Sequence, residues 1–102
     1  MYARFVSGNF NPENFEIMTR TFDKEVLPLL KKQAGFKDEL MFFDDAKKEA
    51  FAISFWDDKA NMDRYEKTIY PEVHKKMERH FTDTPKVRKF MVGNSTWYDI
   101  HA

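Results

Sequence analysis

EAFAISFW, residues 49–56, is the most concentrated apolar stretch of this sequence, and its pattern decides the fold. Eight residues make a typical strand, and the large side chains of Phe51, Ile53 and Phe55 recur at a period of two. The alternate positions also carry no charge: Ala50, Ala52, Ser54 and Trp56. The pattern therefore predicts a strand without a solvated face. Because one small domain can cover one face of its sheet with its own helices, we expect a second copy of the chain to cover the other.

Length and composition define the class of protein. The 102 residues are expected to form one domain, 1–102, with a core of its own. The 17 basic and 17 acidic residues are interspersed, which argues against nucleic acid or a membrane surface as the main partner. The sequence has no cysteine, and therefore no thiolate nucleophile or Cys-ligated zinc. It also shows no leader-like or membrane-spanning run, which is typical of a cytoplasmic protein.

Aromatic residues are unusually frequent, with 11 Phe, 4 Tyr and 2 Trp making 17% of the chain. Aromatic side chains gather where protein surfaces meet and where flat ligands bind. A core rich in phenylalanine is the alternative explanation. The composition thus fits an interface or an aromatic ligand, and equally a core built from phenylalanine.

The segment before residues 49–56 predicts a strand, a helix and a second strand. Residues 2–6 are expected to form the first strand, and the turn-forming residues 7–12 to end it. Apolar residues then recur at steps of three and four, which indicates a helix with Asn11 as its N-cap. We expect a kink or a local break at Pro28, which lacks a backbone donor, and the end of the helix at Gly35.

The second half of the chain is expected to continue with a hairpin and a second helix. Residues 36–43 are apolar on consecutive positions and are expected to pair antiparallel with residues 49–56. A second helix follows, capped by Asp57 or Asp58, and Pro71 is expected to divide it into two segments.

The last strand is predicted to be long, over residues 87–98, with a bulge at residues 93–94. The resulting order is β-α-β-β-α-β, the ferredoxin-like α+β fold with a four-stranded antiparallel sheet and helices on one face. Two such sheets packed about a twofold axis would form a dimeric α+β barrel. We expect this homodimer to enclose an aromatic interior between the two sheets.

Two segments carry a resemblance to a known family: VLPLLKKQAGF at residues 26–36 and AISFWDDKA at residues 52–60. In both, as in element order over nearly the whole chain, the sequence resembles the antibiotic biosynthesis monooxygenase-like (ABM) family of dimeric α+β barrels. The shared features are a helix that runs into Gly-Phe and a strand that ends in Trp before acidic residues. The resemblance implies this fold and a set of activities, among them cofactor-independent oxygenation of polycyclic phenols and haem degradation.

The match to the haem-degrading branch is incomplete. That branch uses a histidine late in the second helix, a tryptophan earlier in the same helix and an asparagine on the first strand. His74 lies near the first of these positions and Tyr65 near the second, but their spacing is short. The first strand has Arg4-Phe5-Val6 and no asparagine, since Asn9 lies beyond it. Haem is therefore a disfavoured cofactor, and no cofactor is expected.

Four residues are the candidates for a site. His74, at the border of a helical apolar stripe, is the catalytic candidate, because histidine is the side chain that most often acts as a general base. Its alternative role is that of a surface histidine bonded to solvent or a carbonyl. Trp56, Tyr65 and Arg4 are the candidate substrate-binding residues. Each also has a structural alternative: helix packing for Trp56, a backbone acceptor for Tyr65, and a carboxylate or solvent for Arg4.

Other polar residues are weaker candidates. Tyr70 and Tyr98 can donate to a substrate oxygen, as can many tyrosines that instead bond to the backbone. His80 is expected at a helix end and His101 lies near the last residue. No His-Glu-x-x-His or similar spacing occurs, so no metal site is predicted.

Two functions fit these observations. The first is an ABM-like monooxygenase that acts without metal or cofactor on a phenolic or other aromatic small molecule in an aromatic pocket. The alternative is a non-catalytic dimer of the same fold that binds a small ligand or serves a stress-related role. Haem binding or degradation is a third, minor alternative. The sequence leaves the substrate open.

Overall fold

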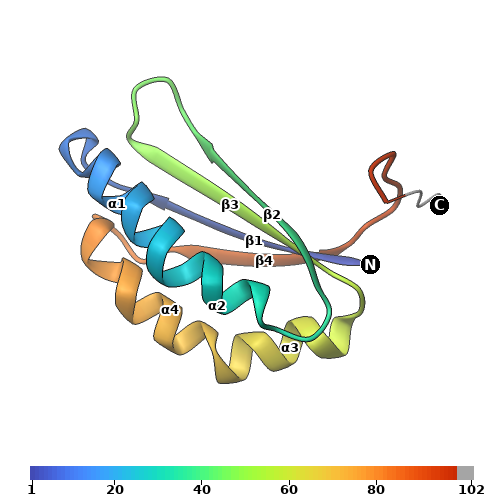
Figure 1. Cartoon of the computed structure of the whole chain (residues 1–102). Helices are drawn as coiled ribbons and strands as arrows, with labels where there is room; N and C mark the ends of the chain where they lie inside the picture. Colours follow the sequence, from blue (N-terminus) through green and yellow to red (C-terminus); the bar gives the residue numbers. More distant parts are fainter. Residues whose placement is uncertain (99–102) are drawn as a thin grey trace.

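Strands and helices alternate in the predicted order, and the computed structural model describes residues 1–98 (Figure 1). The strands are β1 (Tyr2–Asn9), β2 (Phe36–Phe43), β3 (Glu49–Trp56) and β4 (Lys86–Met91). They form one sheet in the order β2-β3-β1-β4, in which all neighbouring strands are antiparallel. This is the ferredoxin-like α+β fold that the sequence predicts, so the prediction is confirmed.

Two helical regions pack on the same side of this sheet (Figure 1). The first consists of a 3₁₀ turn η1 (Pro12–Asn14), α1 (Phe15–Thr21), a π-helical segment η2 (Phe22–Val26) and α2 (Leu27–Lys31). The second consists of α3 (Lys59–Thr68), α4 (Tyr70–Met77) and a 3₁₀ turn η3 (Glu78–His80). We call the helix-covered side of the sheet the inner face and the opposite side the outer face. No helix within residues 1–98 is both long enough and apolar enough to cross a bilayer.

Prolines divide both helical regions at the predicted places. Pro28 is in the first turn of α2 and follows the wider π-helical segment, because a proline cannot donate the backbone hydrogen bond of a regular α-helix. Pro71 likewise lies in the first turn of α4 and separates it from α3. The regular α-helix is thus interrupted just before Pro28, as expected for a local break, and the predicted division at Pro71 is confirmed.

The link from the first helical region to β2 depends on Gly35. This glycine has φ +82°, a left-handed backbone conformation that favours glycine. A β-carbon at this position would also clash with Asp57 Oδ1 and with the side chain of Asn61. Of the two predicted caps of α3, Asp58 is the one used, since its side chain accepts a 2.8 Å hydrogen bond from the Asn61 amide.

Two strand boundaries differ from the prediction. The first strand continues to Asn9 instead of ending near residue 6, because its last residues still pair with β3, where Asn9 is opposite Glu49. The last strand ends at Met91 instead of continuing to residue 98. Its only neighbour is β1, and Met91 is already opposite Tyr2, the first residue of that strand. Without a further partner, an extended segment has no ladder to join.

The register of the sheet separates two kinds of side chain. On β3, Trp56 and Ser54 face the helices and are buried, whereas Phe51, Ile53 and Phe55 project from the outer face. Large apolar side chains from all four strands cover the outer face: Phe5, Leu40, Phe42, Phe51, Ile53, Phe55 and Phe90. None of the helices in residues 1–98 lies over them (Figure 1). The sequence predicts one apolar face of the sheet that the helices of the chain leave uncovered, and the outer face is this surface.

Candidate functional site

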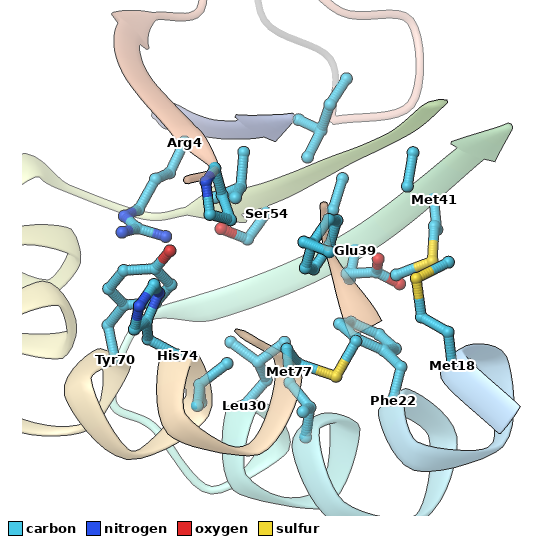
Figure 2. A pocket seen from close by; sticks show the side chains of 18 of the residues that line it. Arg4, Met18, Phe22, Leu30, Glu39, Met41, Ser54, Tyr70, His74 and Met77 are labelled. Carbon is cyan, nitrogen blue, oxygen red and sulfur yellow. The ribbon is translucent and has the colours of Figure 1, made fainter. Parts of the chain in front are cut away.

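A pocket lies between the inner face of the sheet and the helices (Figure 2). Its cavity volume is about 80 Å³, and the space that also takes in the solvent at its open mouth is about 720 Å³. The walls are mainly apolar side chains of the helices and the sheet: Val6, Met18, Phe22, Val26, Leu30, Met41, Val73 and Met77. Ala50, Ala52 and Ser54 lie at the floor on β3, where their small side chains leave room under the helices.

The pocket is on the side of β3 that carries small residues. Side-chain volume is the physical reason, because Ala52 and Ser54 leave space beside the inner face. The aromatic interior expected between the sheets of two copies would be on the opposite side, which carries Phe51, Ile53 and Phe55, and it stays a prediction.

Polar side chains form a row across the floor of the pocket. Glu39 on β2 is opposite Ser54 on β3, Ser54 is opposite Arg4 on β1, and Arg4 is opposite Lys89 on β4. Directly opposed residues of antiparallel strands project from the same face, here the inner one. The first three members of this row line the pocket. A carboxyl group and a guanidinium group therefore face one cavity, with the small hydroxyl group of Ser54 between them.

Arg4 is a buried cation at one end of the pocket, with only 2% of its surface exposed. Its Nε atom is 3.5 Å from Glu66 Oε2 on α3, and its guanidinium group lies over the Tyr70 ring at 3.8 Å from the centroid. Among residues 1–98, no hydrogen-bond acceptor contacts its buried Nη2 atom. A buried guanidinium with an unused donor is expected to attract an anionic or strongly accepting ligand group.

Glu39 is the acidic group at the other end of the pocket. Its side chain lies near Met18, Met41 and Phe22 (Figure 2). Its Oε2 atom is shielded from solvent and accepts no hydrogen bond from the described part of the chain. Burial, with a smaller contribution from the neighbouring carboxylates of Asp38 and Asp23, raises the pKa of Glu39 to about 7. This carboxyl group is therefore partly protonated near neutral pH.

His74 lies in the wall of the pocket on α4, one turn after Tyr70. Its side chain is 35% exposed, and its Nε2 atom is 3.3 Å from Glu78 Oε2. Figure 2 shows Tyr70, His74 and Arg4 at the same end of the pocket, away from Glu39. His74 thus combines contact with the pocket and access to solvent, as expected for a residue at the rim.

Trp56 is behind the pocket wall and does not line it. The side chain is fully buried and stacks on Tyr65, with ring centroids 4.9 Å apart. Its indole Nε1 donates a 2.9 Å hydrogen bond to the Ser54 hydroxyl. These contacts match the packing role that the sequence left open for Trp56. Tyr65 itself lines the pocket, and burial raises the pKa of its hydroxyl group.

The remaining candidates lie elsewhere. His80 is buried at the end of the second helical region, where burial and then the Arg79 charge lower its pKa. Tyr98 contacts Phe55 on the outer face, with ring centroids 5.9 Å apart. His101 lies outside the described residues. Across residues 1–98, no group of three or more histidine, aspartate or glutamate side chains is arranged to hold a metal ion.

Sequence reasoning missed Glu39. The sequence contains a signal, because FKDELMFF places Glu39 at even spacing from Met41 and Phe43 and therefore on an apolar face of the strand. An acid at such a position is rarely buried without a reason. The sequence does not show which face the helices cover, so the signal could be interpreted only with the register.

Comparison with solved structures shows the same fold in oxygenases and in proteins of other description. A monooxygenase from the ActVA-Orf6 gene of Streptomyces coelicolor, solved with the ligand nanaomycin D, matches with a TM-score of 0.76 and 9% identity; the match covers 89% of this chain and 86% of that one. An antibiotic biosynthesis monooxygenase matches with a TM-score of 0.73 and 16% identity, over 90% and 98% of the two chains.

A third structure, NE2512 from Nitrosomonas europaea, is described as a protein of unknown function. It matches with a TM-score of 0.70 and 14% identity, over 89% of this chain and 87% of that one. No protein-family model matches the sequence, and no curated protein matches it either. The chain therefore has the ABM-like fold, as the sequence resemblance implied, and the chemistry must be argued from its own pocket.

Proposed function

We propose that this protein is an ABM-like monooxygenase that uses dioxygen to oxidise a phenolic or other aromatic small molecule, without a metal or a bound cofactor. The observation that carries the proposal is the buried, incompletely bonded guanidinium of Arg4 at the floor of a largely apolar pocket. Apolar walls suit a flat aromatic ring, and the cation suits the negative charge that forms when such a ring loses a proton. Oxygenases with the same fold support this choice of reaction class.

The chemistry balances with dioxygen as the only co-reactant. A base of the protein takes a proton from an acidic ring C–H, and the electron pair of that bond spreads over the ring to an oxygen substituent. The carbanion then gives its electrons to dioxygen and forms a C–O bond, and a proton completes the hydroperoxide. Loss of water from a CH–OOH group leaves a ketone, so that CH₂ and O₂ become C=O and H₂O. The pocket contributes orientation, a dry environment and the positive charge of Arg4.

His74, the base that the sequence suggests, is one of two groups in the pocket lining that compete for this step, and Glu39 is the other. It lines the pocket, and its contact with Glu78 and partial exposure suit exchange of protons with solvent. The same partial exposure favours the second candidate function, in which the pocket binds an aromatic molecule and no reaction follows. The two functions differ in whether bound ligand is consumed together with oxygen.

The test is turnover of a panel of anthrones and substituted hydroquinones under air and under argon, with oxygen uptake measured by electrode. We expect uptake and product formation only under air. Arg4→Met should lower kcat/KM by roughly 100-fold, the effect of removing one group that stabilises a developing anion. Arg20→Met removes an exposed arginine on α1 and is the matched control. Ligand binding without oxygen uptake by any compound would favour the second function. A haem titration followed at the Soret band checks that haem is not used.

We also propose that a second copy of the chain covers the outer face. This face is apolar at its centre, whereas its two edges carry opposite charges: Asp38 is on β2, and Lys86 and Arg88 are on β4. A twofold axis along the strands would lay the acidic edge of one copy over the basic edge of the other. Sedimentation velocity at micromolar concentration should show a dimer. A stable single-copy species would contradict this proposal and leave the pocket, which lies within one chain, unaffected.

A further inference from the structure

The floor of the pocket holds two opposite charges that are not paired with each other. Arg4 has its ionic contact with Glu66 on α3, outside the floor, while Glu39 has none within the described residues. Burying a charge without a partner is unfavourable, and a carboxylate and a guanidinium group in one cavity normally form an ion pair. A ligand between the two groups would make use of both.

The sheet sets the separation of these groups. Glu39 and Arg4 are in register on strands that flank β3, so their Cα atoms lie roughly 10 Å apart, twice the strand spacing. Only Ser54 lies between them in the row, and its small side chain cannot fill the gap. The two side chains lie at opposite ends of the pocket (Figure 2), so a ligand along this row would meet a guanidinium group at one end and a carboxyl group at the other.

The hydroxyl group of Ser54 is oriented for donation. It accepts the 2.9 Å hydrogen bond from Trp56 Nε1, so its own proton points to another acceptor. Ser54 lines the pocket, and a ligand oxygen near Arg4 would be within the same polar row. Trp56 thus acts through Ser54 as a positioning residue, although it does not touch the pocket itself.

We propose that Glu39 is the base that removes the substrate proton, and that Arg4 and the Ser54 hydroxyl bind the ring oxygen that receives the charge. This assignment rests on the proposed function and defines its substrate class as a fused aromatic carbon acid whose acidic C–H lies across the ring from an oxygen substituent. In the step, the C–H proton moves to the Glu39 carboxylate, and the electron pair of the C–H bond remains on the ring as an enolate. No oxidant is needed until dioxygen reacts.

The environment of Glu39 suits this role. The carboxyl group is partly buried, with its Oε2 atom shielded from solvent, and has a pKa of about 7, so near neutral pH it is a stronger base than an ordinary glutamate. Asp38 and Asp23 are the charged groups that contribute to this shift. The other titratable or charged groups of the pocket are Arg4, Tyr65, Tyr70, His74 and Glu78. Among them, His74 is the competing base, and the experiment must separate it from Glu39.

Proton removal can be measured without oxygenation. Anthrone is incubated with the protein in deuterated buffer under argon, and the loss of its C10 proton signal is followed by NMR, after subtraction of the buffer-catalysed rate. We expect the protein to accelerate exchange. Glu39→Gln, which keeps the shape of the side chain, should lower the acceleration by about 100-fold or more, the usual contribution of a general base. The exchange rate of the wild type should rise with pH through about 7, and that of the variant should not.

Four further variants complete the test. Glu49→Gln makes the same substitution at an exposed glutamate on β3 and should exchange like the wild type. His74→Asn should leave most of the acceleration, and Ser54→Ala should reduce it while the pH midpoint stays unchanged. If Glu39→Gln does not fold, Glu39→Asp moves the carboxylate back by one methylene group and should slow exchange without abolishing it.

The outcomes separate this inference from the proposed function. Exchange that depends on Glu39, together with absence of oxygen uptake, would support the base and overturn the oxygenase. Exchange that is lost in His74→Asn and kept in Glu39→Gln would overturn the assignment of Glu39 while the oxygenase stands. No acceleration of exchange by the wild-type protein would also overturn the assignment.

Discussion

The two faces of the sheet are both apolar, yet they differ in side-chain size and in the use of charge. On the inner face of β3, alanine and serine leave a pocket under the helices, and only Trp56 at the strand end is large. On the outer face, the large side chains of Phe51, Ile53 and Phe55 project from the sheet, and no helix in residues 1–98 covers them (Figure 1). An alternation of small and large residues in one strand thus places the pocket on one face and the apolar surface, for which we propose association, on the other.

Charge divides the faces in the same way. On the inner face, Arg4 is buried on the inner strand β1, and the Oε2 atom of Glu39 is shielded from solvent although β2 is an edge strand. On the outer face, Asp38 and Arg88 are on the two edge strands, where none of the helices in residues 1–98 covers them (Figure 1). Charges in contact with water contribute little, whereas burial beside the apolar pocket raises the pKa of Glu39 and leaves a donor of Arg4 available to a ligand. The inner face is therefore the one on which chemistry is expected.

The largest effect on stability is expected from removing the buried Trp56 side chain at the end of the inner face. Trp56→Ala removes a fully buried ring that packs on Tyr65 and Phe36, and should lower the free energy of unfolding by about 3 to 5 kcal/mol. Trp97→Ala is the matched control, because that side chain is 66% exposed. Urea unfolding followed by circular dichroism measures both. Equal losses in the two variants would show that the inner face does not depend on this packing.

The next effect tests the outer face. Phe51→Asp places a charge at the centre of this face, where Phe51 contacts the rings of Phe5 and Phe42, and should raise the dimer dissociation constant by at least about 100-fold, near 2.7 kcal/mol. Ile17→Asp changes an apolar side chain that is 48% exposed on α1, on the helix side of the molecule, and should leave association unchanged. Analytical ultracentrifugation over a concentration series decides. Equal weakening by both variants would argue against an interface on the outer face.

Much of the fold could be predicted because local signals are strong. Gly35 and Pro71 mark ends and starts of helices, and the alternating pattern of residues 49–56 predicts the bounds of β3 correctly. The last strand could not be placed as well, since its length depends on where β1 ends as a partner at Tyr2. Pairing across 89 positions of sequence is invisible to a local pattern.

The site could be predicted only in part for the same reason. Arg4, Tyr65 and His74 attract attention as polar or aromatic residues on apolar elements, and the structure places all three in the lining of one pocket. Their roles remain predictions. Glu39 escapes notice because β2, β3 and the first helical region together create its surroundings. The sequence also does not show which face of β3 the helices choose, and that choice decides whether Trp56 meets a ligand or the core.

The smallest effect is a pH dependence that only the inner face should show. The pKa of Glu39 is about 7 in the folded protein and near 4.5 in the unfolded chain. Between these values the folded state binds more protons, so this group stabilises the protein fully below pH 4.5, and its contribution is lost as pH rises through 7. The complete shift corresponds to about 3 kcal/mol. Because the side chain is partly exposed, solvent reduces the expected loss to roughly 1 to 2 kcal/mol.

The Glu39→Gln side chain cannot lose a proton, so the free energy of unfolding of this variant should lack the pH-dependent contribution of Glu39. We expect the free energy of unfolding of the wild type, taken relative to that of Glu39→Gln, to fall by roughly 1 to 2 kcal/mol between pH 4.5 and pH 8. Urea unfolding at constant ionic strength and one protein concentration measures the difference, which keeps any dimer contribution fixed. Glu49→Gln supplies the background for the same substitution at an exposed site. A relative stability that stays flat or rises with pH would mean that the Glu39 carboxyl group is well solvated, and the contrast between a charged inner face and an apolar outer face would then lose its electrostatic basis.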